Sequence, residues 1–162
     1  ETRTITQTTP RDLGLNKKNL ETVIEAMVGV TQDGTSRLSF VGAPYLSAGK
    51  TGTAQAVTIG QNEKYDAKKL AEFERDHSLY IAFAPAAAPE VALAIIVENA
   101  GFGSAHAAPI ARRVFDYMLL GLYPSEEDIA AVQKGLATAP IGKPRLKVDV
   151  PLIRTPDPTT LE

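Results

Sequence analysis

The chain has 162 residues, of which 44% are hydrophobic, and its formal net charge is −2 at pH 7. This length fits one domain of ordinary size with a buried core. The near-neutral charge argues against a nucleic-acid-binding surface, which would need clustered Lys and Arg. The absence of cysteine excludes a disulfide framework and a thiol-ligated metal. No apolar run reaches the roughly 18 residues of a membrane span, and the first residue is Glu1 rather than methionine, so we expect a piece of a longer protein.

The first strongly predicted element is a helix over residues 17–30. Asn16 is a suitable N-cap, because its side chain can accept a hydrogen bond from a free backbone N–H of the first turn. Large apolar side chains recur every three or four residues, the pattern of an amphipathic helix. They are Leu20, Val23, Ile24, Met27 and Val28. We expect this stripe to face the core.

The next element is a strand over residues 48–57, and it carries the motif of greatest functional interest. Lys50 lies between Gly49 and Gly52, and two threonines follow it, at positions 51 and 53. Glycines weaken a strand because they increase backbone entropy and offer nothing to pack. We therefore expect another group to approach the backbone closely at this point.

Two motifs compete for this lysine. A phosphate-binding P-loop needs a glycine five residues before the Gly-Lys pair and a helix that begins at the lysine. Position 44 holds Pro44 where that glycine is needed, and the residues after Thr51 are poor helix formers, so the P-loop is disfavoured. The alternative is the Lys-Thr-Gly box of penicillin-recognising serine enzymes, formed here by Lys50, Thr51 and Gly52.

A strand explains why these residue types suit a binding edge. Lys50 and Gly52 share one face of a strand, while Thr51 and Thr53 share the other. The free N–H and C=O groups of a strand edge can pair with an extended peptide. The lysine then supplies positive charge for a carboxylate, the threonine hydroxyls add hydrogen bonds, and Gly52 keeps the strand thin beside the ligand.

Three further elements follow in the chain. Apolar, β-rich runs at 78–84 and 91–97 predict an antiparallel hairpin inside the sheet. A helix is predicted over 109–120, and Gly121 is expected to end it. Its inward stripe is predicted to be Ile110, Val114, Tyr117 and Met118. The same helix carries Arg112 and Arg113, which we interpret as surface charge. The predicted fold class is therefore α+β, an antiparallel sheet flanked by helices.

The last forty residues predict little regular structure. Ser125, followed by three acidic residues, is a good helix start. After Gly135 the chain carries five prolines and is expected to be an extended, partly disordered tail. The two histidines, His77 and His106, lack a partner at metal-ligand spacing and are interpreted as structural or exposed. We therefore expect no metal site and no cofactor.

Several of these stretches together resemble a known family. The run from Lys50 to Gln55, Lys-Thr-Gly-Thr-Ala-Gln, is similar to the corresponding box of class B penicillin-binding proteins. Residues 76–85, 91–99 and 107–116 resemble the next two sheet strands and the final domain helix of the elongation-type enzymes, in the same order and spacing over about residues 15–120. Thr51 also favours the elongation type, since division-type relatives often carry serine there. The resemblance implies that residues 1–122 are the C-terminal part of a transpeptidase domain and that residues 123–162 are an extension.

The resemblance also implies an activity. In the family, a serine attacks the D-Ala-D-Ala bond of a peptidoglycan stem peptide, an acyl-enzyme forms, and an amine resolves it; β-lactam antibiotics mimic the donor. Carried over to this chain, Lys50 and the Thr53 backbone N–H, an oxyanion donor, are catalytic. Thr51, Gly52 and Thr53 bind the substrate or antibiotic. The family places the parent protein in the bacterial inner membrane with its catalytic domain in the periplasm.

The nucleophile of this family is expected outside the chain. Ser47 and Lys50 match Ser-x-x-Lys by spacing. Residues three apart on a strand point to opposite faces, so this lysine cannot activate Ser47. No Ser-x-Asn triplet occurs in the sequence. The upstream part of the same protein would supply both boxes, and this chain alone is expected to be inactive. A non-catalytic peptide-binding module of the same fold is the alternative.

Overall fold

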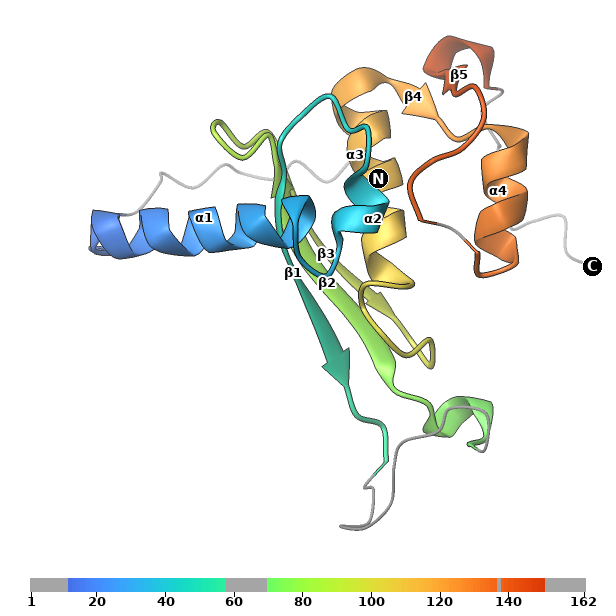
Figure 1. The fold of residues 1–162 in the computed structure, drawn as a ribbon, viewed down its shortest axis with the longest axis horizontal. Helices are drawn as coiled ribbons and strands as arrows, with labels where there is room; N and C mark the ends of the chain where they lie inside the picture. Colours follow the sequence, from blue (N-terminus) through green and yellow to red (C-terminus); the bar gives the residue numbers. More distant parts are fainter. Residues whose placement is uncertain (1–11, 58–69, 137, 151–162) are drawn as a thin grey trace, which may run out of the picture.

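We analysed a computed structural model, which describes residues 12–57, 70–136 and 138–150. Its chain runs through a long helix and a short one, a three-stranded sheet, a second long helix and a small C-terminal layer (Figure 1). The elements are α1 (Lys17–Gln32), α2 (Arg37–Phe40), β1 (Ala48–Ala54), the 3₁₀ turn η1 (Glu72–Glu74), β2 (His77–Ala84), β3 (Val91–Val97), α3 (Ala107–Leu120), β4 (Leu122–Tyr123), α4 (Glu126–Gln133), β5 (Arg145–Leu146) and the 3₁₀ turn η2 (Lys147–Asp149). The predicted α+β class is confirmed.

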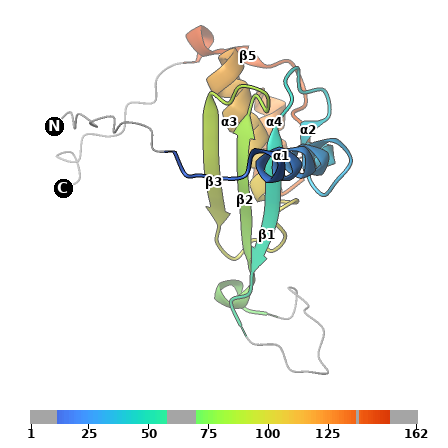
Figure 2. The ribbon, with the colours of Figure 1, turned by 90° about the vertical axis from the view of Figure 1, so that its left-hand side faces the viewer.

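The sheet has the order β1-β2-β3, and both pairs of strands are antiparallel. The predicted hairpin of β2 and β3 is confirmed, and β1 ends at Ala54, three residues earlier than expected. Figure 2 shows the three strands side by side, with α3 behind them. Among the described residues, β1 pairs with β2 alone, so its other edge is left without a strand partner.

The two faces of this sheet differ sharply. Its closed face packs against α3 and contains a continuous core. That core comprises Phe40, Tyr80, Ala82, Ala84, Ala107, Ala108, Ala111 and Phe115. The open face includes Leu79, Ile81, Phe83, Ala92, Ala94 and Ile96, none of which is buried. Ile81 is 53% exposed and Ile96 is 67% exposed, so this apolar surface has no cover within the described residues.

Helix α1 begins as predicted. The Asn16 side chain accepts a hydrogen bond from the Asn19 N–H at 3.1 Å. The helix projects away from the body of the molecule and contacts it only near its C-terminal end, beside β1 (Figure 1). As a result, the first half of its apolar stripe is not in a core, because Leu20 and Val23 are exposed. The expected burial of the whole stripe is therefore wrong for the described chain.

Helix α3 turns a different face inward from the one predicted. Its buried residues include Ala107, Ala108, Ala111 and Phe115, whereas Ile110, Val114 and Met118 are exposed. Alanine lets the helix backbone approach the strands closely, so the small side chains and one phenylalanine fill the interface. Gly121 ends the helix in the left-handed conformation (φ 66°), as glycine does at no steric cost.

The C-terminal layer is more ordered than the sequence indicated. The Ser125 side chain caps α4 by accepting from the Asp128 N–H at 3.0 Å, as predicted. Beyond Gly135, however, the described residues return to the body of the molecule, where β5 pairs antiparallel with β4. The expectation of an extended tail is wrong for residues 138–150, because polar groups of α3 and α4 bind their backbone. Within the described ranges, no helix combines the length and apolar character needed to cross a membrane.

Candidate active-site strand

The predicted site residues all lie on strand β1. Lys50 pairs with Ile81 of β2, and Thr51 pairs with Tyr80. Since cross-strand partners share a face, Lys50 lies on the open face and Thr51 on the closed face. Lys50 and Thr53 are exposed, while Thr51 and Gly52 are half-buried. The strand therefore offers a cation on one face and a hydroxyl on the other, within two consecutive residues.

The side chains of Lys50 and Thr51 each form a hydrogen bond. The Lys50 Nζ donates to the Thr51 carbonyl oxygen at 2.6 Å. The Thr51 Oγ1 lies 3.0 Å from the Thr35 Oγ1, and either hydroxyl can be the donor. Thr35 lies in the turn between α1 and α2, so the site already includes a residue from outside the strand.

Close contacts explain the glycines in and beside β1. A Cβ on Gly49 would lie 2.1 Å from the Tyr80 hydroxyl oxygen, so the group that approaches this backbone is a core tyrosine rather than a ligand. A Cβ on Gly52 would lie 3.2 Å from the Leu79 Cβ. Gly103, in the loop after β3, is also closely packed. Its Cβ would lie 2.6 Å from the Gly52 carbonyl oxygen, so this loop packs directly against the strand.

Tyr80 supports β1 from the closed face of the sheet. Its hydroxyl lies 3.0 Å from the buried Ser36 Oγ, which also donates to the Val30 carbonyl oxygen at 3.0 Å. Burial raises the pKa of Tyr80 above its ordinary value, and the hydrogen bond with Ser36 offsets this only in part. The tyrosine is therefore neutral near pH 7 and acts as a hydrogen-bonded support for the strand.

The structure excludes two other uses of this segment. A P-loop needs a helix that begins at the lysine, whereas Lys50 is in the middle of a strand. Ser47 is 2% exposed, and its hydroxyl has no hydrogen-bond partner within the described chain, so it is not presented to a substrate. His77 has a structural contact, because its Nδ1 accepts from the Asn99 N–H at 3.0 Å.

Arg112 and Arg113 are not the surface charges that the sequence predicts. Arg112 is buried, the Arg113 side chain is only 10% exposed, and each forms an ion pair. The Arg112 Nε lies 2.9 Å from the Asp116 Oδ1, which also accepts from the Tyr45 hydroxyl at 2.7 Å. The Arg113 Nη2 lies 2.6 Å from the Asp128 Oδ1. Burial, followed by the hydrogen bond to Asp116, raises the pKa of Tyr45 far above its ordinary value.

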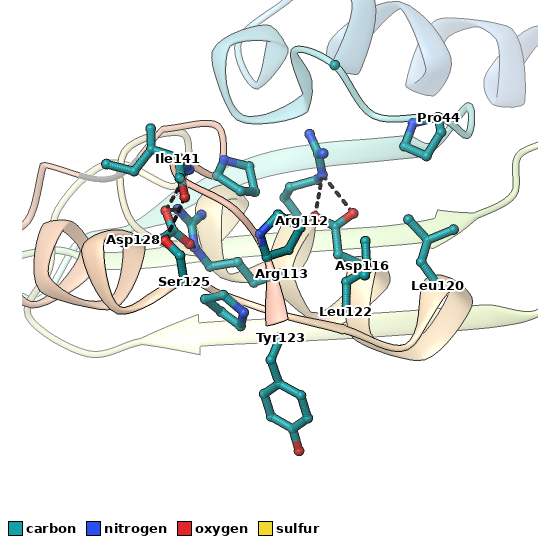
Figure 3. Close-up of a pocket in the computed structure, with 15 residues that line it drawn as sticks. Pro44, Arg112, Arg113, Asp116, Leu120, Leu122, Tyr123, Ser125, Asp128 and Ile141 are labelled. Atoms are coloured by element: carbon teal, nitrogen blue, oxygen red, sulfur yellow. Dashed lines mark hydrogen bonds and ion pairs between the residues drawn. The ribbon is translucent and has the colours of Figure 1, made fainter. Parts of the chain in front are cut away.

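These ion pairs line a cavity of about 310 Å³ between α3 and the C-terminal layer (Figure 3). Figure 3 shows the two arginines extending from α3, one toward Asp116 and the other toward Asp128. Leu120, Leu122 and several prolines supply the apolar part of the lining. The residues that line this cavity include none from β1, so it is separate from the Lys-Thr-Gly strand.

Two contributors to the site were not predicted from the sequence. Thr35 and Gly103 contact β1 from segments 16 and about 50 residues away, and no local pattern announces either contact. Turn residues such as Gly103 and Thr35 indicate where the chain changes direction, but not which strand the turn will contact.

Comparison with known proteins identifies the class of this fold and site. The family model described as "Penicillin binding protein transpeptidase domain" matches residues 1–116. The chain therefore belongs to the penicillin-binding protein transpeptidase domain family, as the Lys-Thr-Gly-Thr-Ala-Gln resemblance indicated.

Within the family, the chain is similar to proteins named peptidoglycan D,D-transpeptidase MrdA. It is 48% identical to that of Acinetobacter baumannii over 97 residues, which cover 59% of this chain and 14% of the relative. It is 44% identical to that of Haemophilus influenzae over 95 residues, covering 59% of this chain and 15% of the relative. The chain thus spans about a seventh of the length of these relatives.

Solved structures agree on the fold. The Pseudomonas aeruginosa PBP2 structure, in complex with WCK 5153, matches 73% of this chain and 23% of its own, at 33% identity and a TM-score of 0.56. A complex between PBP2 and MreC from Helicobacter pylori matches 72% of this chain and 21% of its own, at 30% identity and a TM-score of 0.55.

Proposed function

We propose that this chain is the C-terminal part of the catalytic domain of a peptidoglycan D,D-transpeptidase of the elongation type. The observation that carries the proposal is the placement of Lys50, Thr51, Gly52 and Thr53 on a strand with an unpaired edge among the described residues. An extended stem peptide can add to such an edge through main-chain hydrogen bonds. The names of the similar proteins support the reaction class.

The reaction is an acyl transfer from a D-Ala-D-Ala stem peptide. A serine oxygen bonds to the carbonyl carbon of the penultimate D-Ala, the terminal D-Ala leaves with a proton, and an amine of a second stem peptide then displaces the serine. Lys50 supplies positive charge to the site. The Thr51 and Thr53 hydroxyls bind the terminal carboxylate, and the Thr53 N–H stabilises the oxyanion. Gly52 leaves room for the substrate beside the strand. β-Lactam antibiotics enter the same site as donor mimics.

The serine is supplied by another part of the same protein. Ser47 is buried and cannot take this role. The open face, with Ile81 and Ile96 exposed, is an apolar surface of the kind found at interfaces with another protein segment. We assign its cover to the part of the domain that carries the Ser-x-x-Lys and Ser-x-Asn boxes. Residues 1–122 then belong to the catalytic domain and 123–162 form its extension.

The parent protein is proposed to act at the bacterial inner membrane, with this domain in the periplasm where peptidoglycan is assembled. This assignment rests on the family alone. No metal or cofactor is needed, because the proposed acyl transfer uses side chains and backbone N–H groups only.

The test is the intact mass of the protein after incubation with a penicillin. The full-length protein is expected to gain one adduct, located on a serine upstream of residue 1, and this chain alone is expected to gain none. Lys50→Ala in the full-length protein should slow adduct formation by about 100-fold or more, whereas Lys18→Ala on the exposed part of α1 should not. A full-length protein that binds the stem peptide but forms no adduct would support the non-catalytic binding module instead. An adduct on this chain alone would implicate Ser47 and contradict the proposal.

A further inference from the structure

Within the described residues, the Thr51 hydroxyl forms its hydrogen bond with the hydroxyl of Thr35. The two Oγ1 atoms are 3.0 Å apart, although the residues are 16 positions apart in the sequence. We propose that Thr35 is a positioning residue, which orients the Thr51 hydroxyl so that its proton points to the carboxylate of a bound donor. The inference rests on the proposed function, since it assigns a role within the same site.

The turn that carries Thr35 is held firmly against the strand. The Gly34 N–H donates to the Gly29 carbonyl oxygen at 2.9 Å, and the Ser36 N–H donates to the Val30 carbonyl oxygen at 3.1 Å. Ser36 is itself buried against Tyr80. The residues on both sides of Thr35 are thus fixed, one to α1 and the other also to β2, so the distance between the two hydroxyls is set by the backbone.

A second contact ties the same end of α1 to the start of β1. The Thr31 hydroxyl donates to the Ser47 carbonyl oxygen at 2.7 Å, immediately before the strand begins. The strand therefore cannot shift along its axis without breaking this contact as well as the Thr35–Thr51 pair. Together these contacts make the C-terminal end of α1 the reference against which Thr51 is placed.

The hydrogen-bonding capacity of a hydroxyl explains why the pair matters for an anion. Each threonine hydroxyl has one proton to donate and two lone pairs that accept. When Thr35 donates to Thr51, the Thr51 proton is left for the ligand, and a carboxylate accepts it. When Thr51 donates to Thr35, Thr51 presents only lone pairs to the ligand, which repel a carboxylate. A carboxylate therefore selects the first arrangement, which the Thr35 hydroxyl supplies at a position fixed by the backbone.

Exposure separates this role from a contribution to folding. The Thr35 side chain is exposed and Thr51 is half-buried, so a ligand at the strand edge can reach the pair. A hydrogen bond between exposed neutral groups adds little to stability, since water replaces either partner. Removing the Thr35 hydroxyl should therefore change ligand recognition more than it changes the unfolding temperature.

The experiment compares acylation of the full-length protein by benzylpenicillin and by its methyl ester, which lacks the carboxylate charge. Thr35→Val is expected to slow acylation by benzylpenicillin about 2- to 10-fold, the range of one net hydrogen bond. Thr35→Ser, which keeps the hydroxyl, should restore the rate to within about twofold. Acylation by the ester should be the same in all three proteins. In a Thr51→Val background, Thr35→Val should have no further effect.

A matched control is available on the same helix. The Thr22 hydroxyl donates to the Lys18 carbonyl oxygen on the exposed part of α1, so Thr22→Val removes an equivalent hydroxyl away from the site. It should change neither rate. An equal loss for the acid and the ester, a loss that persists in the Thr51→Val background, or no loss at all would overturn the positioning role while leaving the proposed function intact. A wild-type protein that benzylpenicillin does not acylate would overturn the proposed function, and this inference with it.

Discussion

The two faces of the sheet belong to the same three strands, but one face is buried and the other is exposed. On the closed face, Tyr80 and Ala82 are covered by α3, and the chain supplies every group that contacts them. On the open face, Ile81 alternates with these residues and remains more than half exposed. Within the described residues, the packing of one face is complete and that of the other is not. Lys50 belongs to the incomplete face.

The largest effect is expected from a large-to-small substitution on the closed face. Phe115 is fully buried, with its ring centroid 6.4 Å from that of Phe40 and 6.2 Å from that of Tyr45. Phe115→Ala should lower the free energy of unfolding by about 3–5 kcal/mol. Ile96→Ala on the open face should change it by less than about 0.5 kcal/mol in this chain. Urea unfolding followed by circular dichroism measures both, and equal losses would contradict the difference between the faces.

The second prediction concerns the same substitution, Ile96→Ala, made in the full-length protein. If another part of the protein covers the open face, this isoleucine becomes a core residue, and the substitution should lower the free energy of unfolding by about 2 kcal/mol or more. The measurement is the urea midpoint of the transition that includes this domain. A value as small as that in the isolated chain would mean that the face stays exposed in the complete protein.

The contact between the loop after β3 and the Lys-Thr-Gly strand gives a third prediction. A Cβ at Gly103 would lie 2.3 Å from the Leu79 carbonyl oxygen and 2.6 Å from that of Gly52, both backbone atoms. Gly103→Ala should therefore lower the free energy of unfolding by about 1–3 kcal/mol, since the backbone must shift. Gly29→Ala on α1, where a Cβ meets nothing within 4 Å, is the control and should be neutral or stabilising. Thermal unfolding distinguishes the two.

Two helix caps allow a smaller comparison between the projecting helix and the C-terminal layer. Asn16 makes one capping bond at the exposed start of α1. Ser125 caps α4 and also donates to the Ile141 carbonyl oxygen at 2.7 Å. Ser125→Ala should cost about 1–2 kcal/mol and Asn16→Ala about 0.5–1 kcal/mol. The reverse order, measured by thermal unfolding, would mean that the C-terminal layer is not part of the cooperative unit.

The last prediction concerns the free energy of unfolding at high pH, and no effect is expected near neutral pH. The pKa values of Tyr45 and Tyr80, both on the closed side, are raised above the ordinary value of 10.0. Above about pH 10 the unfolded chain releases these protons while the folded chain retains them, so the free energy of unfolding should fall as the pH rises. Tyrosinate absorbance should show both residues ionising at a higher pH in the folded than in the unfolded chain. Tyr45→Phe should make the fall less steep, and an unchanged slope would contradict the assignment.

Much of the fold was predictable because it depends on local periodicity. Apolar, β-rich runs predicted β2 and β3, whereas β1 was placed by its Lys-Thr-Gly motif. The inward face of α3 was not predictable in the same way. Large side chains such as Ile110 and Met118 dominate a pattern based on hydrophobicity. The actual interface depends on how closely Ala107 and Ala111 let the helix approach β2 and β3, which is a property of two elements together.

In the candidate site, too, features contained in neighbouring residues were predictable, and contacts between distant segments were not. The Lys50 box was found because its chemistry is contained in consecutive residues. The Arg112–Asp116 pair spans four positions of one helix, so helical spacing could have revealed it. The partners of Arg113 and Thr51 could not be found this way, because Asp128 and Thr35 are brought to them only by the turns of the complete fold.

The Arg113–Asp128 pair also has a consequence for how this family diversifies. Arg113 lies within the stretch that the family model matches, which ends at residue 116, whereas Asp128 lies beyond it. The side chains are 10% and 1% exposed, so either charge alone would be left largely shielded from water without a counter-charge. The two positions must then change together during evolution. Family members whose chains stop after the equivalent of α3, or continue differently, are expected to have an uncharged residue where this chain has Arg113.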